Sequence, residues 1–208
     1  MHKPNLRAYR FKEVPLTPFH WKVVYDGDGQ VLYNPDGSGD LVFAPQVAQT
    51  SANTHAVLLL LKDTLAQPVK DYAVKIELTT KQQLRSSTPN DWEVFWFFGN
   101  YRKDPGQSKV ANYVILKPNT GIELGRVFDE VGQHFLKTDS VHGTQIGERV
   151  TLAIVKKGRH LQVFKNGNLV MSYESGQLPE ALYDLPGALG LYSEDALVRV
   201  HSFAYQAL

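Results

Sequence analysis

Carboxyl groups could carry hydrolytic chemistry in this chain, and their spacing decides whether two of them can act as a pair. A glycosidase that retains configuration needs a nucleophile and an acid whose carboxyl groups lie about 5–5.5 Å apart. One strand pattern that supplies them is Glu-x-Asp-x-x-Glu. Glu93, Glu123 and the pair Asp129-Glu130 are not followed by acidic residues at those positions. The sequence therefore disfavours a two-carboxylate glycosidase.

Cations, amides and phenols near residues 100–134 could support a different reaction, the elimination that cleaves uronate-containing glycans. Such a lyase needs a cation or amide that neutralises the uronate carboxyl group, and a His, Tyr or Lys base that removes the C5 proton. The alternative is a solvated polar face, on which the cations pair with Glu93 and Glu123. The candidates for the lyase chemistry are Asn100, Tyr101, Arg102, Tyr113, Lys117, Arg126 and His134.

Sugar binding requires less, because aromatic rings can stack on the apolar faces of sugars while polar side chains pair with hydroxyl groups. The run from Trp92 to Phe98 is apolar on both faces, so one of its two rows must lie away from the main core. We expect Trp96 to face a ligand, and Trp96→Ala to abolish glycan binding while the fold stays intact. The alternative is that these aromatic residues are all core residues. The expected ligand-binding set is Trp96, Phe98, Asn100, Arg102, Tyr113, Lys117, Glu123 and Arg126.

Two acidic, glycine-rich segments raise the question of a metal ion. The first contains Asp26 and Asp28, and the second runs from Asn34 to Asp40. The second segment matches the first positions of an EF-hand loop, but Pro45 stands where the bidentate Glu should be, so it is not an EF-hand. The alternative for both segments is a plain turn, since Asp, Asn and Gly are the residues that turns need.

Composition excludes several classes of protein. The 208 residues carry 22 Lys plus Arg and 21 Asp plus Glu, a net charge of +1, which argues against a nucleic-acid partner. The absence of Cys excludes disulfides, a thiolate nucleophile and Cys-ligated metal sites. The longest apolar run, residues 56–61, falls short of the roughly 18–20 residues that cross a bilayer, so we expect no membrane insertion.

Alternation of apolar and polar residues with a period of two recurs along the chain, which is typical of an all-β protein. Residues 72–79 predict a strand with one wet face. Residues 150–173 predict a three-stranded meander, whose second turn contains Asn166-Gly167, a strong hairpin signal. Further strands are predicted at 92–98, 112–117, 122–127 and 196–205.

Helix is scarce in this pattern. Only the stretches near 80–88 and 177–184 could hold a short helix. No linker, repeat or low-complexity segment interrupts the chain. We therefore expect residues 1–208 to form a single β-sandwich domain, with residues 1–20 as an extended arm or edge strand.

The order of these elements resembles the concanavalin A-like lectin/glucanase superfamily, and within it bacterial laminin G-like jelly-roll domains. The resemblance rests on the strands already named, and above all on Gly147–Thr151 followed by Gly158–Gly167. The chain also has Gly190-Leu191-Tyr192 before its last strand. It departs from many relatives at His201-Ser202-Phe203, where they carry an Asp-Asn pair, so no role of that pair carries over.

The resemblance implies a two-sheet antiparallel jelly-roll β-sandwich and a carbohydrate partner. It also implies one structural Ca²⁺ beside the last strand, for which Asp26, Asp28 and Asp195 would be ligands. The leading function is polysaccharide binding on the concave face of one sheet, without catalysis. The first alternative is an enzyme on the same face, a lyase of uronate-containing glycans, and the second is a protein-interaction domain.

The location expected for such a protein is extracytoplasmic and bacterial, either periplasmic or secreted. Residues 1–5 nevertheless lack the apolar stretch of a signal peptide. No feature of the sequence specifies an oligomeric state.

Overall fold

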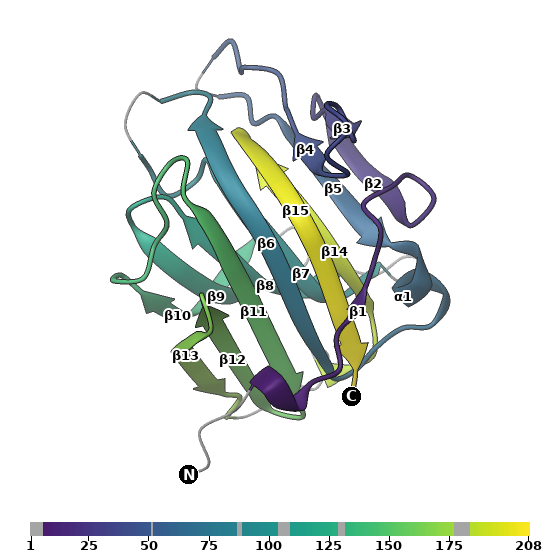
Figure 1. The fold of residues 1–208 in the computed structure, drawn as a ribbon. Coiled ribbons are helices and arrows are strands. Elements are labelled where there is room, and N and C mark those ends of the chain that lie inside the picture. The colour runs from purple at the N-terminus through teal and green to yellow at the C-terminus, as the bar shows by residue number, and fades with distance from the viewer. Residues whose placement is uncertain (1–5, 51, 87–88, 104–108, 129–131, 177–183) are drawn as a thin grey trace.

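The computed structural model describes residues 6–50, 52–86, 89–103, 109–128, 132–176 and 184–208. Within these residues the chain forms an eight-stranded and a seven-stranded sheet, and all neighbouring strands are antiparallel. Figure 1 shows the two sheets as stacked layers, with β6, β11 and β15 in front of β7, β8 and β14. The fold class is therefore the expected all-β sandwich.

The eight-stranded sheet has its two longest strands at its centre. Its order is β13 (Asn168–Glu174), β12 (His160–Lys165), β11 (Arg149–Lys157), β6 (Tyr72–Gln83), β15 (Ala196–Ala207), β4 (Leu41–Phe43) and β3 (Val31–Tyr33), with β1 (Lys12–Glu13) also paired with β15.

The seven-stranded sheet is centred on the aromatic strand β7. Its order is β10 (Gln133–Asp139), β9 (Gly121–Phe128), β8 (Lys109–Lys117), β7 (Val94–Lys103), β14 (Ala188–Glu194), β5 (Ala56–Leu61) and β2 (Trp21–Gly27).

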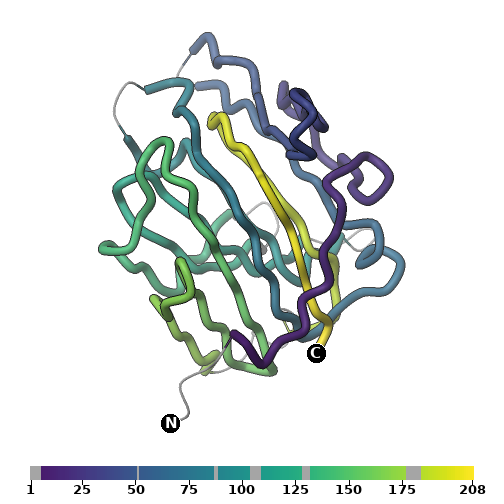
Figure 2. Tube along the Cα trace, in the orientation of Figure 1, coloured from purple at the N-terminus to yellow at the C-terminus, as the bar shows by residue number. Residues whose placement is uncertain are grey.

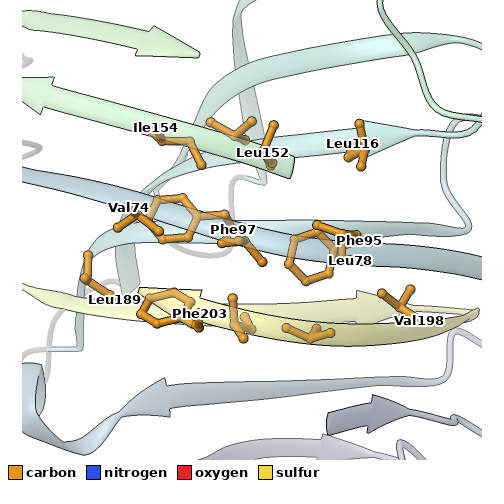
Figure 3. Packing of buried hydrophobic residues seen from close by; sticks show 14 of the residues in the cluster. Val74, Leu78, Phe95, Phe97, Leu116, Leu152, Ile154, Leu189, Val198 and Phe203 are labelled. Carbon is orange, nitrogen blue, oxygen red and sulfur yellow. The ribbon is translucent and has the colours of Figure 1, made fainter. Parts of the chain in front are cut away.

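The main core lies between the sheets and is built by one row of side chains from each strand. In Figure 3, Phe95 and Phe97 of β7 face Phe203 of β15 together with the aliphatic residues of β6 and β11. These residues are almost fully buried. Because side chains alternate along a strand, every second residue of each apolar run points into this core.

The meander predicted at residues 150–173 is confirmed as β11, β12 and β13. Asn166 and Gly167 both adopt positive φ, 50° and 82°, as the Asn-Gly hairpin signal requires. The strand predicted at residues 72–79 is also confirmed, and it extends to Gln83 as β6.

One of the two helix predictions needs correction, and the other is not tested. Residues 80–83 belong to β6 and residues 84–86 are not helical, so the described part of the stretch 80–88 holds no helix. The stretch 177–184 lies outside the described residues except for Asp184. A short helix α1 (Lys62–Ala66) stands instead where the chain leaves β5, and the Thr64 hydroxyl donates a hydrogen bond of 2.9 Å to the Leu61 carbonyl.

The described part of the N-terminal segment lies against the eight-stranded sheet. After the 3-10 turn η1 (Leu6–Ala8), it runs along β15 and pairs with it through β1, as the purple and yellow segments of Figure 2 show. Tyr9 and Phe11 pack over the outer face of the eight-stranded sheet. No helix among the described residues is long and apolar enough to cross a membrane.

Candidate functional site

The outer face of the seven-stranded sheet carries a second apolar cluster, separate from the main core. Because side chains alternate along β7, Phe95 and Phe97 point inward, while Trp96 and Phe98 point to this outer face. Trp96 lies beside Tyr192 of β14. The Trp96 row therefore lies away from the main core, while a ligand at Trp96 stays a prediction.

An open groove with a volume of about 840 Å³ runs over this cluster. Trp96 forms its floor and is only 4% exposed. Its ring stacks on Phe98 at a centroid distance of 5.6 Å and meets Tyr192 edge-on at 5.6 Å. The aromatic residues that line the groove are Tyr25, Trp96, Phe98, Tyr101 and Tyr192.

A β-bulge places two consecutive polar residues in the groove. Tyr101 and Arg102 both line it, although neighbours on a regular strand point to opposite faces. The register between β7 and β8 shifts between Gly99 and Arg102, and Asn100 adopts a φ of 54°. A bulge of this kind re-aims side chains. The expected binding residues Phe98 and Arg102 thus reach the groove together with Trp96.

Three further expected binding residues lie on the same sheet face but pair with one another. The Tyr113 hydroxyl donates a hydrogen bond of 3.0 Å to Glu123, and Lys117 Nζ lies 3.2 Å from the same carboxylate. Lys117 also lies 3.5 Å from Asp91. All three are buried, and none of them lines the groove. These residues form a buried polar cluster. Lys117 and Glu123 pair with each other, as in the alternative in which the cations pair with carboxylates.

The last two expected binding residues, Asn100 and Arg126, belong to a buried chain of hydrogen bonds. Asn100 Nδ2 donates to the carbonyl groups of Val69 and Lys70, at 3.1 and 2.9 Å. Asn112 Nδ2 donates to Asn100 Oδ1, and Arg126 Nε donates to Asn112 Oδ1. Neither Asn100 nor Arg126 lines the groove. These hydrogen bonds connect β7 and β9 to segments beside other strands, so the two side chains fit a structural role better than ligand binding.

Sequence reasoning missed the contribution of β14. Tyr192 and Glu194 line the groove, and the Tyr192 hydroxyl donates a hydrogen bond of 3.4 Å to Glu194. Burial, and then the charge of Asp195, raise the pKa of Glu194 to about 7. The alternation of Tyr192 and Glu194 with Leu191 and Ser193 is a period-two signal that could have revealed them.

The expected calcium ligands are not gathered into one site. Asp26 and Asp28 line a separate cavity of about 480 Å³. Asp195 is fully buried, accepts the His55 backbone N–H at 3.0 Å and lies 3.4 Å from Arg85 Nε. Among the described residues, no group of three or more His, Asp or Glu side chains is arranged to hold a metal ion. The calcium site stays a prediction without geometric support.

The second acidic loop has a structural role on the other sheet. Asn34 Oδ1 accepts the Gly39 N–H at 2.7 Å, which closes the loop between β3 and β4. Asp36 lies 2.6 Å from Arg199 of β15, and Asp40 accepts hydrogen bonds from both Arg199 and His201. The loop is thus a turn, as the alternative reading proposed, and it is anchored to β15.

No protein-family profile and no curated protein matches the chain. Solved structures do resemble it. The carbohydrate-binding module CBM66 from Bacillus subtilis is 12% identical, with a TM-score of 0.58 over 87% of this chain and 91% of that one. The Bacillus licheniformis β-glucanase is 10% identical, with a TM-score of 0.61 over 94% and 96%. A Bacillus subtilis protein of unknown function with a galectin-like fold is 12% identical, with a TM-score of 0.62 over 95% and 98%.

These likenesses establish the fold. The chain is a two-sheet jelly-roll β-sandwich.

Proposed function

We propose that this protein binds a polysaccharide in the groove on the outer face of the seven-stranded sheet. The observation that carries the proposal is the set of aromatic rings along the groove, Tyr25, Trp96, Phe98, Tyr101 and Tyr192. Pockets with apolar walls and a few polar groups are the usual form of ligand site.

The dimensions of the groove favour a chain of sugars over a single sugar. Glu194, at one end of its lining, pairs with Val94, the first residue of β7. Lys103, at the other end, is the last residue of β7. Nine steps along a strand span roughly 30 Å. The open form of the groove would let a polysaccharide run along it.

The structural neighbours support the same proposal from a different direction. They include a carbohydrate-binding module and a β-glucanase, both built on this fold. Because folds of this kind host several functions, the groove carries the assignment of a ligand and the neighbours only support it. The laminin G-like likeness would instead suggest a protein partner, but the chemistry of the groove favours a sugar.

Catalysis in the same groove is the second candidate, as a lyase of uronate-containing glycans. Tyr101 and Arg102 stand side by side in the groove, which is the pairing of base and cation that elimination needs. Burial raises the pKa of Tyr101, however, and so favours its protonated form, which cannot act as a base. Among the described lining residues Glu194 is the one carboxylic acid, so a two-carboxylate glycosidase finds no support.

Incubation with a panel of neutral and uronate-containing polysaccharides, followed by gel filtration, tests both candidates. Co-elution of one polymer with the protein at unchanged length would support binding. A shortened polymer whose products absorb in the ultraviolet would support the lyase. The absence of any effect across the panel would contradict both and favour a protein partner.

A matched pair of variants locates the site. We expect Tyr101→Ala to weaken binding about tenfold, because it removes a partly exposed ring from the groove wall. Phe19→Ala is the control, since Phe19 is 80% exposed and does not line the groove. Equal affinity of the two variants would contradict the proposed location.

A further inference from the structure

Among the residues that the structure describes, the charged ones that line the groove are divided between its two ends. Arg102, Lys103 and Lys109 lie at the end of β7, where Lys103 pairs with Lys109 across the strands. Glu194 lies at the opposite end, beside Val94. The separation along β7 is roughly 25–30 Å, several Debye lengths at physiological salt. The cations of the groove therefore do not neutralise Glu194.

Other cations near Glu194 are engaged elsewhere. Arg85 Nε lies 3.4 Å from Asp195, and Arg85 Nη1 donates a hydrogen bond of 2.7 Å to the Asn53 carbonyl. Lys117 is held by Glu123 and Asp91. Arg85 does favour the ionised form of Glu194, but its effect is smaller than those of burial and of Asp195.

Negative charge is thus in excess at this end of the groove. Asp195 adjoins Glu194 in the chain, and Glu93 adds a further carboxylate that disfavours ionisation of Asp195. Burial and then the charge of Asp195 outweigh Arg85 here, and they raise the pKa of Glu194 to about 7. A half-buried carboxyl group with a raised pKa in a groove is a recognised sign of a functional site.

Aromatic rings surround this carboxyl group. Tyr192 donates its hydroxyl to Glu194, and the Trp96 ring lies 5.6 Å from the Tyr192 ring. Tyr25 lines the same end and is close enough to influence the ionisation of Tyr192. Aromatic faces attract cations within about 6 Å. A carboxylate with aromatic neighbours is a combination that suits an ammonium group.

We propose that the Glu194 end of the groove binds the ammonium group of a 2-amino sugar within the polysaccharide. The inference rests on the proposed function and names the substrate class of the same site. The ammonium group would form a charge-assisted hydrogen bond with Glu194 and lie against the rings of Tyr192 and Tyr25. An N-acetylated or a neutral sugar would leave the excess negative charge uncompensated.

Calorimetry with three oligosaccharides of equal length tests the inference: one of glucosamine, one of N-acetylglucosamine and one of glucose. At pH 7.5 we expect the glucosamine oligomer to bind about tenfold more tightly than the other two. Glu194→Gln keeps the shape of the side chain and should abolish this preference. Glu174→Gln, on the exposed surface of β13, should retain it.

Recognition requires an ionised Glu194 and a protonated sugar amine at the same time, so the ratio of wild-type to Glu194→Gln affinity depends on the titration of both groups. We expect this ratio to rise above pH 5.5 as Glu194 ionises, and to fall again at higher pH as the amine loses its proton. A melting curve for each variant shows whether the fold is retained.

Two failures are distinguishable. Equal affinity for the three oligosaccharides, or a preference that survives in Glu194→Gln, would overturn the amino-sugar inference and leave polysaccharide binding in place. If neither these oligosaccharides nor any polymer of the panel bound, the proposed function would fall as well.

Discussion

Glu194 carries a carboxyl group whose ionisation the fold opposes, and this has a consequence for stability. Its pKa is raised from the ordinary 4.5 to about 7, first by burial and then by the charge of Asp195. Between these pH values the folded protein retains a proton that the unfolded chain has lost. This contribution to stability is therefore complete below about pH 4.5 and is lost as the pH rises through 7.

Glu194→Gln removes this titration. We expect the wild-type melting temperature to fall between pH 5 and pH 8 more steeply than that of the variant. Glu194→Gln should be the more stable protein at pH 8. Asp195 remains in both proteins, and because its charge raises the pKa of Glu194, the difference between them includes the coupling of the two carboxyl groups. Parallel melting temperatures over this pH range would contradict the assignment.

Trp96 supports the structure as well as the groove. Its indole is buried among Phe98, Tyr113 and Tyr192. We expect Trp96→Ala to destabilise the protein by about 3–5 kcal/mol in urea denaturation, because it leaves a large cavity. The sequence-based hypothesis of an intact fold in this variant overlooked how deeply the ring is buried.

Trp92→Ala is the matched control, since Trp92 is 57% exposed and makes no groove wall. We expect its unfolding free energy to stay within about 0.5 kcal/mol of the wild type. Similar losses for Trp92→Ala and Trp96→Ala would show that the outer cluster adds little stability.

Among the elements, the hairpin formed by β3 and β4 is attached to β15 by the pairing of β4 and also by charge. Arg199 contacts Asp36 and Asp40, and His201 Nδ1 lies 2.8 Å from Asp40. His201 Nε2 in turn lies 3.0 Å from the Thr79 hydroxyl on β6. Hydrogen bonds from Ser38 and Arg199 lower the pKa of Asp36. Burial by itself would raise the pKa of Asp40, but the contacts with Arg199 and His201 lower it. The attachment should therefore weaken in acid.

Arg199→Ala tests this attachment. It leaves the mostly buried Asp40 without its guanidinium, and we expect a loss of about 1–3 kcal/mol together with faster amide exchange in residues 31–43. Arg149→Ala removes an exposed partner of Glu77 and should cost less than about 1 kcal/mol. Unchanged exchange in the hairpin of Arg199→Ala would contradict the role assigned to these charges.

Elements were predictable where one local signal determined them. The meander of β11 to β13 follows from alternation and from Asn166-Gly167, whose positive φ values the turn requires. Helix α1 escaped prediction because it has only 5 residues, which is too few for a helical period to be recognised. It is also held by a contact with a distant strand, since the Thr64 hydroxyl accepts the Leu189 N–H.

The groove was predictable only in part for a related reason. The two rows of β7 could be read from its sequence, so Trp96 and Phe98 were found. The bulge that turns Tyr101 and Arg102 together into the groove depends on pairing with β8, which no local pattern encodes. Asn100 and Arg126 lie outside the groove, in hydrogen bonds that join segments far apart in the chain, which no local pattern shows.

At the scale of the whole molecule, the two sheets have different outer faces. The seven-stranded sheet presents the groove, whereas the N-terminal arm covers part of the eight-stranded sheet. Leu6, Tyr9 and Phe11 pack against an apolar patch that includes Val155 and Phe164. Lys75 lies 5.9 Å from the centre of the Phe11 ring, and the Arg10 N–H donates to Gln206. The arm thus protects a face that would otherwise expose apolar surface.

Removal of residues 1–11 separates stability from binding. Fully burying one large apolar side chain contributes about 1.5–3 kcal/mol, but the three arm residues are only partly buried and must be ordered, so we expect a loss of roughly 1–3 kcal/mol. The uncovered patch should also promote self-association, measurable by light scattering. Polysaccharide affinity should not change, because the groove lies on the other sheet. A shortened chain that kept its stability but lost binding would place the ligand on the arm-covered face and contradict the groove as the site.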